Sequence, residues 1–125
     1  MNSSRLQPSL AIACIGCGYW GKNLVRNFHN LGVLKLVCDK NDAVLSDLKN
    51  QYSKIETCLA LTDVLSRDYI EGVVISTPAE THFNMAREAL LAGKHVYVEK
   101  PLVLREEEGE ELIELARERN KVLMV

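Results

Sequence analysis

Short apolar runs alternate with longer amphipathic segments along most of the chain. The apolar runs are bounded by Gly, Asp or Pro, and several are rich in β-branched residues, which is typical of strands buried on both faces. The longer segments repeat apolar residues at helical spacing, and two of them stop at a glycine. The pattern predicts strands over residues 10–15, 33–38, 54–57, 72–76, 95–98 and 121–125. It predicts helices over 19–31, 62–66, 82–92 and 105–119, and one further helix that begins at the capping pair Asn41-Asp42.

Strand and helix alternate with short connections, and this order indicates the fold class. Parallel strands need crossovers, and right-handed crossovers place helices on both faces of a sheet. The predicted fold is therefore α/β, a doubly wound parallel sheet in three α/β/α layers. The helix over 105–119 has glutamates in its first half and Arg117 and Arg119 near its end, so its acidic run complements the helix dipole and indicates a solvated face.

Composition limits the classes of function. The 125 residues are 47% apolar and 26% charged, which predicts one globular domain, and the net charge of −2 gives no electrostatic reason to expect nucleic acid or a membrane surface as partner. No apolar run approaches the roughly 20 residues of a membrane span. Residues 1–9 are polar, so we expect a disordered lead-in, a domain over 10–125 and a cytoplasmic location.

The first strand runs into a glycine turn. Gly16, Gly18 and Gly21 form G-x-G-x-x-G at the start of a helix, and Asp39 follows eighteen residues after the third glycine at the end of the next strand. In a dinucleotide site the first glycine makes the tight turn, the second lets a pyrophosphate approach, and the third allows close helix packing. The helix N-terminus then faces the phosphates. The alternative is a structural turn without a ligand.

The acid after the second strand bears on which nucleotide binds. Asp39 is placed to accept hydrogen bonds from the adenosine ribose and to repel a 2′-phosphate, which favours NAD. Lys40 could instead pair with that phosphate, so NADP stays open. S-adenosylmethionine methyltransferases carry a similar turn and acid, and the turn alone does not separate the two classes.

Cys14 and Cys17 form a C-x-x-C that could indicate a redox pair or half of a zinc site. Cys14 lies in an apolar strand and Cys17 in the turn, and no second C-x-x-C follows. Small buried hydrophobic residues are therefore the favoured interpretation, and no metal is expected.

Three blocks together resemble the Gfo/Idh/MocA oxidoreductase family, named for glucose–fructose oxidoreductase and inositol dehydrogenase. They are the turn Gly16-Cys17-Gly18-Tyr19-Trp20-Gly21 with Lys22-Asn23-Leu24, the segment Ser76-Thr77-Pro78-Ala79-Glu80-Thr81-His82, and Glu99-Lys100-Pro101. Their order and spacing match the family's N-terminal NAD(P)-binding Rossmann domain over essentially the whole chain. The third block disfavours a methyltransferase.

The resemblance implies roles for individual residues. Thr77 and Pro78 would lie along the nicotinamide ribose, with His82 nearby, although His82 could equally be a packed or capping side chain. Glu99 and Lys100 would border the nicotinamide, and Lys100, partly desolvated beside a carboxylate, would position or deprotonate the substrate hydroxyl. In relatives the bond before Pro101 is a cis peptide. Tyr19 and Trp20 are also candidate cofactor contacts, with packing under the turn as their alternative.

Relatives continue into a second domain that carries substrate contacts, and we expect this chain to be the cofactor half. Ala79 stands where many relatives have Asn. The resemblance implies an oxidoreductase that moves a hydride between NAD and a secondary alcohol of a sugar, nucleotide sugar or cyclitol, with no turnover by this part alone. A standalone nucleotide-binding module is the alternative, and a homo-oligomer is compatible with the sequence.

Overall fold

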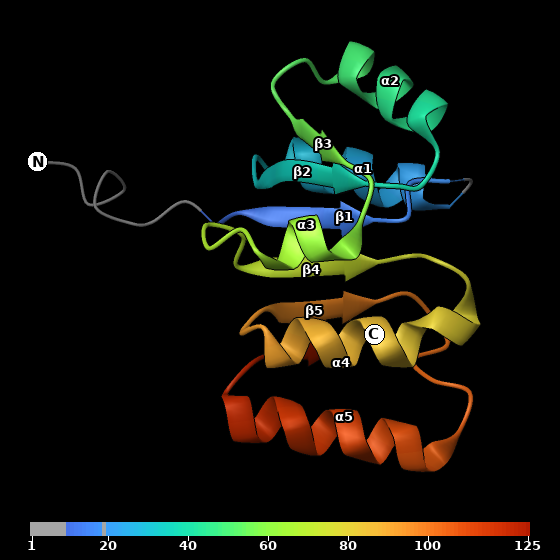
Figure 1. Ribbon diagram of the computed structural model, residues 1–125, viewed down its shortest axis with the longest axis vertical. Helices are drawn as coiled ribbons and strands as arrows, with labels where there is room; N and C mark the ends of the chain where they lie inside the picture. The colour runs from blue at the N-terminus through green and yellow to red at the C-terminus, as the bar shows by residue number, and fades with distance from the viewer. Residues whose placement is uncertain (1–9, 19) are drawn as a thin grey trace, which may run out of the picture.

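The computed structural model describes residues 10–18 and 20–125 of the chain (Figure 1). The predicted lead-in over 1–9 lies outside the described residues, as does Tyr19. The strands are β1 (Ile12–Ile15), β2 (Leu34–Cys38), β3 (Glu56–Cys58), β4 (Gly72–Ile75), β5 (His95–Val98) and β6 (Leu123–Met124). The helices are α1 (Gly21–Asn30), α2 (Asp42–Gln51), α3 (Leu61–Leu65), the 3₁₀ turn η2 (Ala79–Thr81), α4 (His82–Leu91) and α5 (Glu106–Arg119).

All six strands are parallel and lie in the order β3-β2-β1-β4-β5-β6. From β1 the chain adds β2 and β3 toward one edge of the sheet. It then crosses back to place β4 on the other side of β1, and β5 and β6 follow toward the opposite edge. The order therefore reverses between β1 and β4, and in open α/β sheets this switch point is where ligands bind, outside the carboxyl ends of the strands. The predicted doubly wound α/β fold is confirmed.

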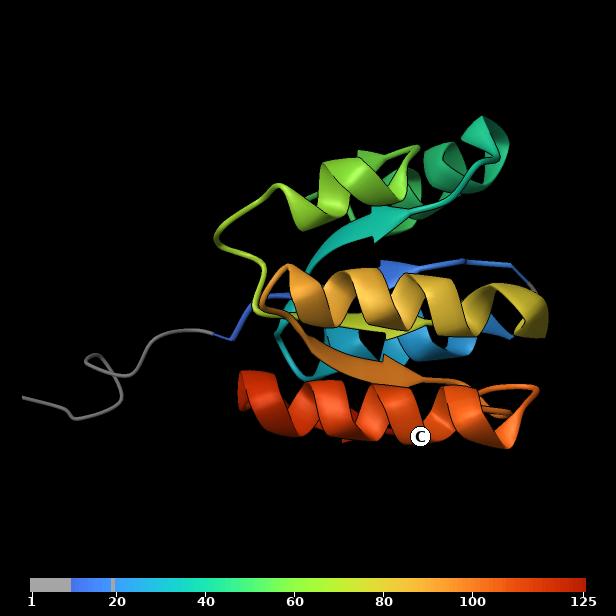
Figure 2. The ribbon, with the colours of Figure 1, turned by 60° about the horizontal axis from the view of Figure 1, so that its bottom comes forward.

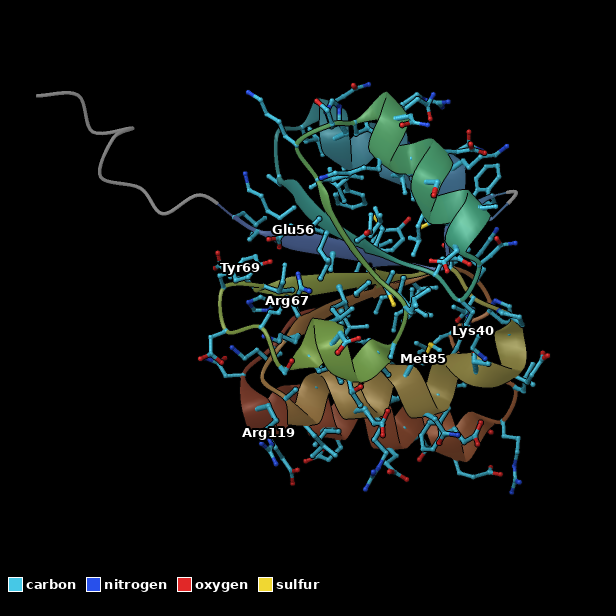
Figure 3. All side chains as sticks on the ribbon, turned by 45° about the horizontal axis from the view of Figure 1, so that its top comes forward. Lys40, Glu56, Arg67, Tyr69, Met85 and Arg119 are labelled. Atoms are coloured by element: carbon cyan, nitrogen blue, oxygen red, sulfur yellow. The ribbon has the colours of Figure 1, made fainter. Side chains whose placement is uncertain are left out.

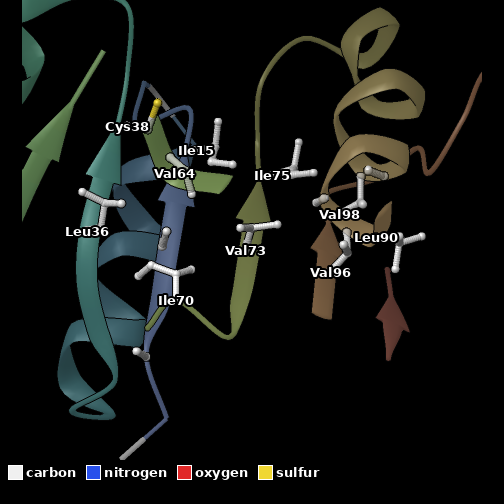
Figure 4. Close-up of a cluster of buried hydrophobic side chains, with 14 of the residues drawn as sticks. Ile15, Leu36, Cys38, Val64, Ile70, Val73, Ile75, Leu90, Val96 and Val98 are labelled. Atoms are coloured by element: carbon white, nitrogen blue, oxygen red, sulfur yellow. The ribbon is translucent and has the colours of Figure 1, made fainter. Parts of the chain in front are cut away.

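The sheet separates two apolar cores. On one face, α3, α4 and α5 cover the inward side chains of the strands, with Val64, Leu90 and Leu112 fully buried. Figure 4 shows Val64 and Leu90 among the strand side chains of this core. On the opposite face, α1 and α2 supply Val25 and Leu48 to the second core. Figure 2 shows α4 and α5 in front of the sheet and α1 behind it, which gives the three layers expected from the alternating pattern.

The helical spacing of apolar residues in the sequence also places Leu31 and Ile113 on the inner stripes of their helices, but both are exposed. Helix α1 ends at Asn30, and Leu31 beyond it is 70% exposed. Ile113 is 51% exposed, because Gly109, Leu112 and Ala116 form the buried face of α5. Helical spacing alone does not locate the edge of the partner layer. Within the described residues, no helix is long and apolar enough to cross a bilayer.

Candidate functional site

The glycine turn after β1 has three glycines in three different environments. Gly16 has a φ of +85°, and a Cβ there would lie 2.8 Å from Thr77 Cγ2. A Cβ on Gly21 would overlap the carbonyl oxygen of Gly16. Gly18, in contrast, has no atom of the described residues, other than its own and those of its chain neighbours, within 4 Å of the position that a Cβ would take. The first and third glycines are therefore required by the fold of the turn, whereas the second leaves room for something outside the chain.

Ser76, at the end of β4, holds the turn in place. Its Oγ donates a hydrogen bond of 2.6 Å to the carbonyl oxygen of Gly16. The same Oγ lies 2.9 Å from the Cβ position of Gly21, so the helix start, the turn and the end of β4 meet at one point. Ser76 was not among the predicted site residues. The signal for it was its position directly after a central strand, next to Thr77.

Asp39 follows β2 and is held by two backbone N–H groups. The N–H of Cys17 donates to Oδ2 at 2.8 Å, and the N–H of Asn41 donates to Oδ1 at 2.9 Å. Each carboxylate oxygen keeps further lone pairs, because an ionised carboxylate can accept about four hydrogen bonds. The side chain is half buried and is fixed in orientation before any ligand arrives. This arrangement suits recognition of a pair of ribose hydroxyls.

A cleft of about 380 Å³ lies at the carboxyl ends of β1, β2 and β4. It brings together six predicted residues, which are Gly16, Gly18, Asp39, Lys40, Thr77 and Pro78. Seven others line it that the sequence did not single out: Ile15, Cys38, Leu59, Leu61, Ser76, Thr81 and Met85. In Figure 3 Lys40 and Met85 lie on the same side of the molecule, at this end of the sheet. The cleft has the mixture expected of a ligand site, apolar walls with a few fixed polar groups.

Thr77 and Thr81 form a short chain of hydroxyls on one wall of the cleft. Thr81 Oγ1 donates to the carbonyl oxygen of Pro78 at 2.6 Å and lies 2.6 Å from Thr77 Oγ1. Either hydroxyl can be the donor in the contact between the two threonines, and Thr77 Oγ1 also lies 3.4 Å from Met85 Sδ, to which it can donate. The lone pairs of Thr77 then remain able to accept a hydrogen bond from a ligand hydroxyl.

The other predicted residues that the structure describes do not line this cleft. Trp20 is 53% exposed beside the turn. Glu99 follows β5, where its N–H donates to the carbonyl of Ile75 at 2.9 Å, and Lys100 is exposed beyond it. The described part of the chain leaves Lys100 exposed, so its partial desolvation stays a prediction. The bond between Lys100 and Pro101 is cis, as the resemblance implied.

His82 is 1% exposed, and both of its ring nitrogens contact backbone carbonyls. Nε2 lies 2.8 Å from the oxygen of Thr77, and Nδ1 lies 2.6 Å from the oxygen of Pro101. No ring nitrogen is left over for a ligand. Of the two interpretations of His82 drawn from the sequence, this geometry favours the packed side chain over direct contact with a cofactor.

All four cysteines are buried free thiols. Burial raises the pKa of Cys17 to about 12, and the nearby charge of Asp39 adds to the effect. Burial also raises the pKa of Cys14. A protonated thiol is a poor nucleophile and a poor metal ligand, so the C-x-x-C has the properties of small buried side chains. Among residues 10–18 and 20–125, no cluster of three or more His, Cys, Asp or Glu side chains has the arrangement of a metal site.

These features fit a dinucleotide. The open position at Gly18 leaves room for a pyrophosphate above the start of α1, where backbone N–H groups and the helix dipole favour negative charge. The fixed carboxylate of Asp39 stands on one side of the turn, and the hydroxyl of Thr77 stands on the other. The residues present are therefore those needed to hold a diphosphate with a ribose at each end.

Curated relatives match most of this chain but are much longer. An uncharacterized oxidoreductase of Synechocystis is 45% identical over 115 residues, which cover 90% of this chain and 31% of the relative. A glycosyl hydrolase family 109 protein of a Shewanella species is 38% identical over 125 residues, which cover 91% of this chain and 27% of the relative. The chain thus spans less than a third of the length of these two relatives.

Solved structures agree with the sequence relatives. GenD2 from gentamicin A biosynthesis, in complex with NAD, superposes with a TM-score of 0.88 at 31% identity, over 94% of this chain and 34% of that protein. The WlbA dehydrogenase of Chromobacterium violaceum, in complex with NADH and UDP-GlcNAcA, superposes with a TM-score of 0.85 at 28% identity. The match covers 94% of this chain and 34% of that protein. The model of the Gfo/Idh/MocA oxidoreductase family, described as an NAD-binding Rossmann fold, matches residues 10–125. The chain belongs to this family and is its NAD-binding domain.

Proposed function

We propose that the chain is the cofactor-binding part of an oxidoreductase that moves a hydride between NAD and a secondary alcohol of a sugar-type substrate. The observation that carries the proposal is the Asp39 carboxylate, fixed by two N–H groups at one end of a cleft whose floor is the open glycine turn. Bound NAD would supply the hydride acceptor. The residues of the cleft would act by holding that cofactor, and Lys100 would act by moving a proton.

Several of the predicted residues have a role that their position allows. The glycine turn receives the pyrophosphate, Asp39 accepts from the adenosine ribose, and Thr77 accepts from the nicotinamide ribose. Lys100 lies past the carboxyl end of β5, on the same edge of the sheet. A lysine there can remove the proton from a substrate hydroxyl as its carbon loses hydride. Because Lys100 is exposed in this chain, we propose that substrate or additional protein covers it during the reaction.

The substrate class is supported by the solved relatives. GenD2 belongs to gentamicin A biosynthesis, and the WlbA dehydrogenase was solved with a UDP-linked sugar acid. Their sequences are about three times as long as the aligned part of this chain. We therefore propose a nucleotide sugar or a related sugar as substrate, with most of its contacts outside the residues described above.

The direct test is titration of the chain with NADH, NAD and NADP, followed by nicotinamide fluorescence and by heat of binding. We expect NAD and NADH to bind and NADP to bind at least about tenfold more weakly, because its 2′-phosphate would meet the Asp39 carboxylate. Absence of binding by all three ligands would contradict the proposal. Tighter binding of NADP would assign Lys40 the phosphate role and reject the preference for NAD.

A second candidate comes from the Shewanella relatives, which are named glycosyl hydrolase family 109 proteins. A protein of that kind would release a sugar from a glycoside instead of accumulating an oxidised product. The two candidates differ in what is formed when the full-length protein carrying this domain is incubated with NAD and candidate sugars. Net NADH formation supports the dehydrogenase, and a free sugar without net NADH supports the hydrolase.

A further inference from the structure

The two loops that border the nicotinamide end of the proposed site leave the sheet side by side. Strand β4 continues into Thr77-Pro78, and strand β5 continues into Glu99-Lys100. The register between these strands ends at Ile75 and Val98, and the N–H of Glu99 still donates to the carbonyl of Ile75 at 2.9 Å. Beyond that point the relative position of the loops depends on other contacts.

His82 supplies such a contact. It lies at the first position of α4, and its ring reaches the Thr77 carbonyl with Nε2 at 2.8 Å and the Pro101 carbonyl with Nδ1 at 2.6 Å. Thr77 belongs to the loop after β4, and Pro101 directly follows Lys100. One buried ring therefore joins the backbone of both loops, one residue away from the proposed catalytic lysine.

A carbonyl oxygen offers only lone pairs, so a hydrogen bond to either carbonyl needs an N–H on the imidazole. Which ring nitrogen carries the N–H depends on the tautomer of the ring. The two contacts, one at each ring nitrogen, place the ring between the two loops.

The same connection extends to the glycine turn. Ser76, which precedes Thr77, donates to the carbonyl of Gly16 at 2.6 Å. The turn after β1, the loop after β4 and the loop after β5 are thus joined in series by Ser76 and His82. An apolar side chain would fill the volume of His82, but it would leave the Thr77 and Pro101 carbonyls without their donors.

We propose that His82 is a positioning residue: it fixes the loop carrying Glu99 and Lys100 against the Thr77-Pro78 loop and so sets the nicotinamide end of the site. The inference rests on the proposed function, because it assigns these loops to that end of the cofactor. It differs from direct cofactor binding by His82, since both ring nitrogens are used within the chain. It also differs from a purely structural role, since it predicts an effect on only one end of the ligand.

Three variants of the full chain separate the two contacts. Asparagine carries a nitrogen at the δ position and can retain the bond to Pro101, so it is the first variant, His82→Asn. Glutamine carries a nitrogen at the ε position and can retain the bond to Thr77, so His82→Gln is the second. His82→Phe keeps an aromatic ring with no donor. The ligands are NADH and ADP-ribose, which share the adenosine end and differ in the nicotinamide.

We expect His82→Phe to weaken the binding of NADH by about tenfold and the binding of ADP-ribose by less than about twofold. The NADH affinities of His82→Asn and His82→Gln should lie between those of His82→Phe and the wild type. Equal losses of affinity for both ligands, or unchanged NADH affinity in every variant, would overturn the inference.

If His82→Phe does not fold, the same comparison of NADH with ADP-ribose in His82→Asn and His82→Gln decides the question. Failure of the wild-type chain to bind either ligand would instead reject the proposed function, and the inference with it.

Discussion

Both ends of the sheet carry clusters of polar side chains. The cluster at the amino end makes its hydrogen bonds within the protein, whereas the cluster at the carboxyl end keeps some hydrogen-bonding groups directed toward a cleft. At the amino end, Lys94 Nζ donates to the carbonyls of Arg67 and Ile70, each at 2.8 Å. Arg67 pairs with Glu56 at 2.9 Å, and the Tyr69 hydroxyl also donates to Glu56. Figure 3 shows Glu56, Arg67 and Tyr69 gathered at this end, away from Lys40 and Met85.

At the carboxyl end, polar groups fix the loops in place around a cleft. Asp39, Ser76 and Thr77 each use part of their hydrogen-bonding capacity within the chain and keep part of it facing the cleft. The amino end is thus closed on itself, whereas the carboxyl end is preorganised for a ligand. Changes at the first should alter the free energy of unfolding, and changes at the second should alter cofactor affinity.

The largest effect is expected at the glycine turn, where a substitution should change both the free energy of unfolding and the cofactor affinity. Gly21→Ala places a methyl group against the Gly16 carbonyl, and we expect a loss of about 3 kcal/mol in the free energy of unfolding together with loss of NADH binding. Gly18→Ala is the matched control, because its Cβ meets nothing within 4 Å. It should unfold in urea like the wild type but bind NADH more weakly. Equal stability of the two variants would contradict this account of the turn.

Alkaline titration tests the buried thiol beneath the turn. The pKa of Cys17 rises from 9.0 to about 12 on folding, so the unfolded chain loses its proton first and stability falls as pH rises above 9. For this one group the loss between pH 9 and pH 11 is about 2 kcal/mol. Cys17→Ala should therefore flatten the pH dependence of urea unfolding by that amount. An unchanged slope would show that the thiol is not buried in its protonated form.

Asp39→Ala should act on affinity with a smaller energetic effect. Removing the carboxylate would delete the hydrogen bonds that we propose it accepts from the ribose, so we expect NAD binding to weaken by about tenfold while NADP binding changes little or improves. Asp39→Asn keeps an acceptor for one backbone N–H and separates the role of charge from that of the loop contacts. Parallel titrations with NAD and NADP provide the measurement, and equal losses for the two cofactors would count against the ribose role.

The smallest effect is expected at the closed end. Lys94→Met removes the donor to two carbonyls and should cost about 1 kcal/mol in the free energy of unfolding, with unchanged NADH affinity. Burial lowers the pKa of Lys94 below 10.5, so the unfolded chain holds that proton more tightly and this group makes stability rise with pH in the range below 10.5. The variant should lose that rise, the opposite of the change at Cys17. A fall in NADH affinity would break the distinction between the two ends.

Local patterns were sufficient for the four central strands, the glycine turn and Asp39, whereas β3 lies two residues later than its predicted start and β6 is shorter than predicted. The apolar runs are long enough to mark buried strands, and the acid follows its strand at a fixed offset from the turn. Residues brought in by the order of strands were not predicted. Leu59 lines the cleft because β3 lies beside β2, and Thr81 and Met85 line it because β4 lies beside β1. Neither adjacency is visible in the spacing of residues along the chain.

Side-chain environment was also beyond the sequence. The pattern placed His82 correctly at a helix start but could not say which way the ring turns, since its partners are carbonyls 5 and 19 positions away. The exposure of Lys100 likewise depends on what covers the end of β5. Leu31 and Ile113 show the same limit for the core, because periodicity identifies one stripe of a helix but not the extent of the layer opposite.

The backbone contacts of Asp39 have a consequence for protein engineering. A designer who wished to switch the cofactor preference would begin by replacing this acid with a small neutral residue to admit a phosphate. That replacement would also release the N–H groups of Cys17 and Asn41, which the carboxylate now holds. A successful redesign would need a substitute acceptor for both loops, so the selectivity of the domain and the shape of its phosphate turn would have to be changed together.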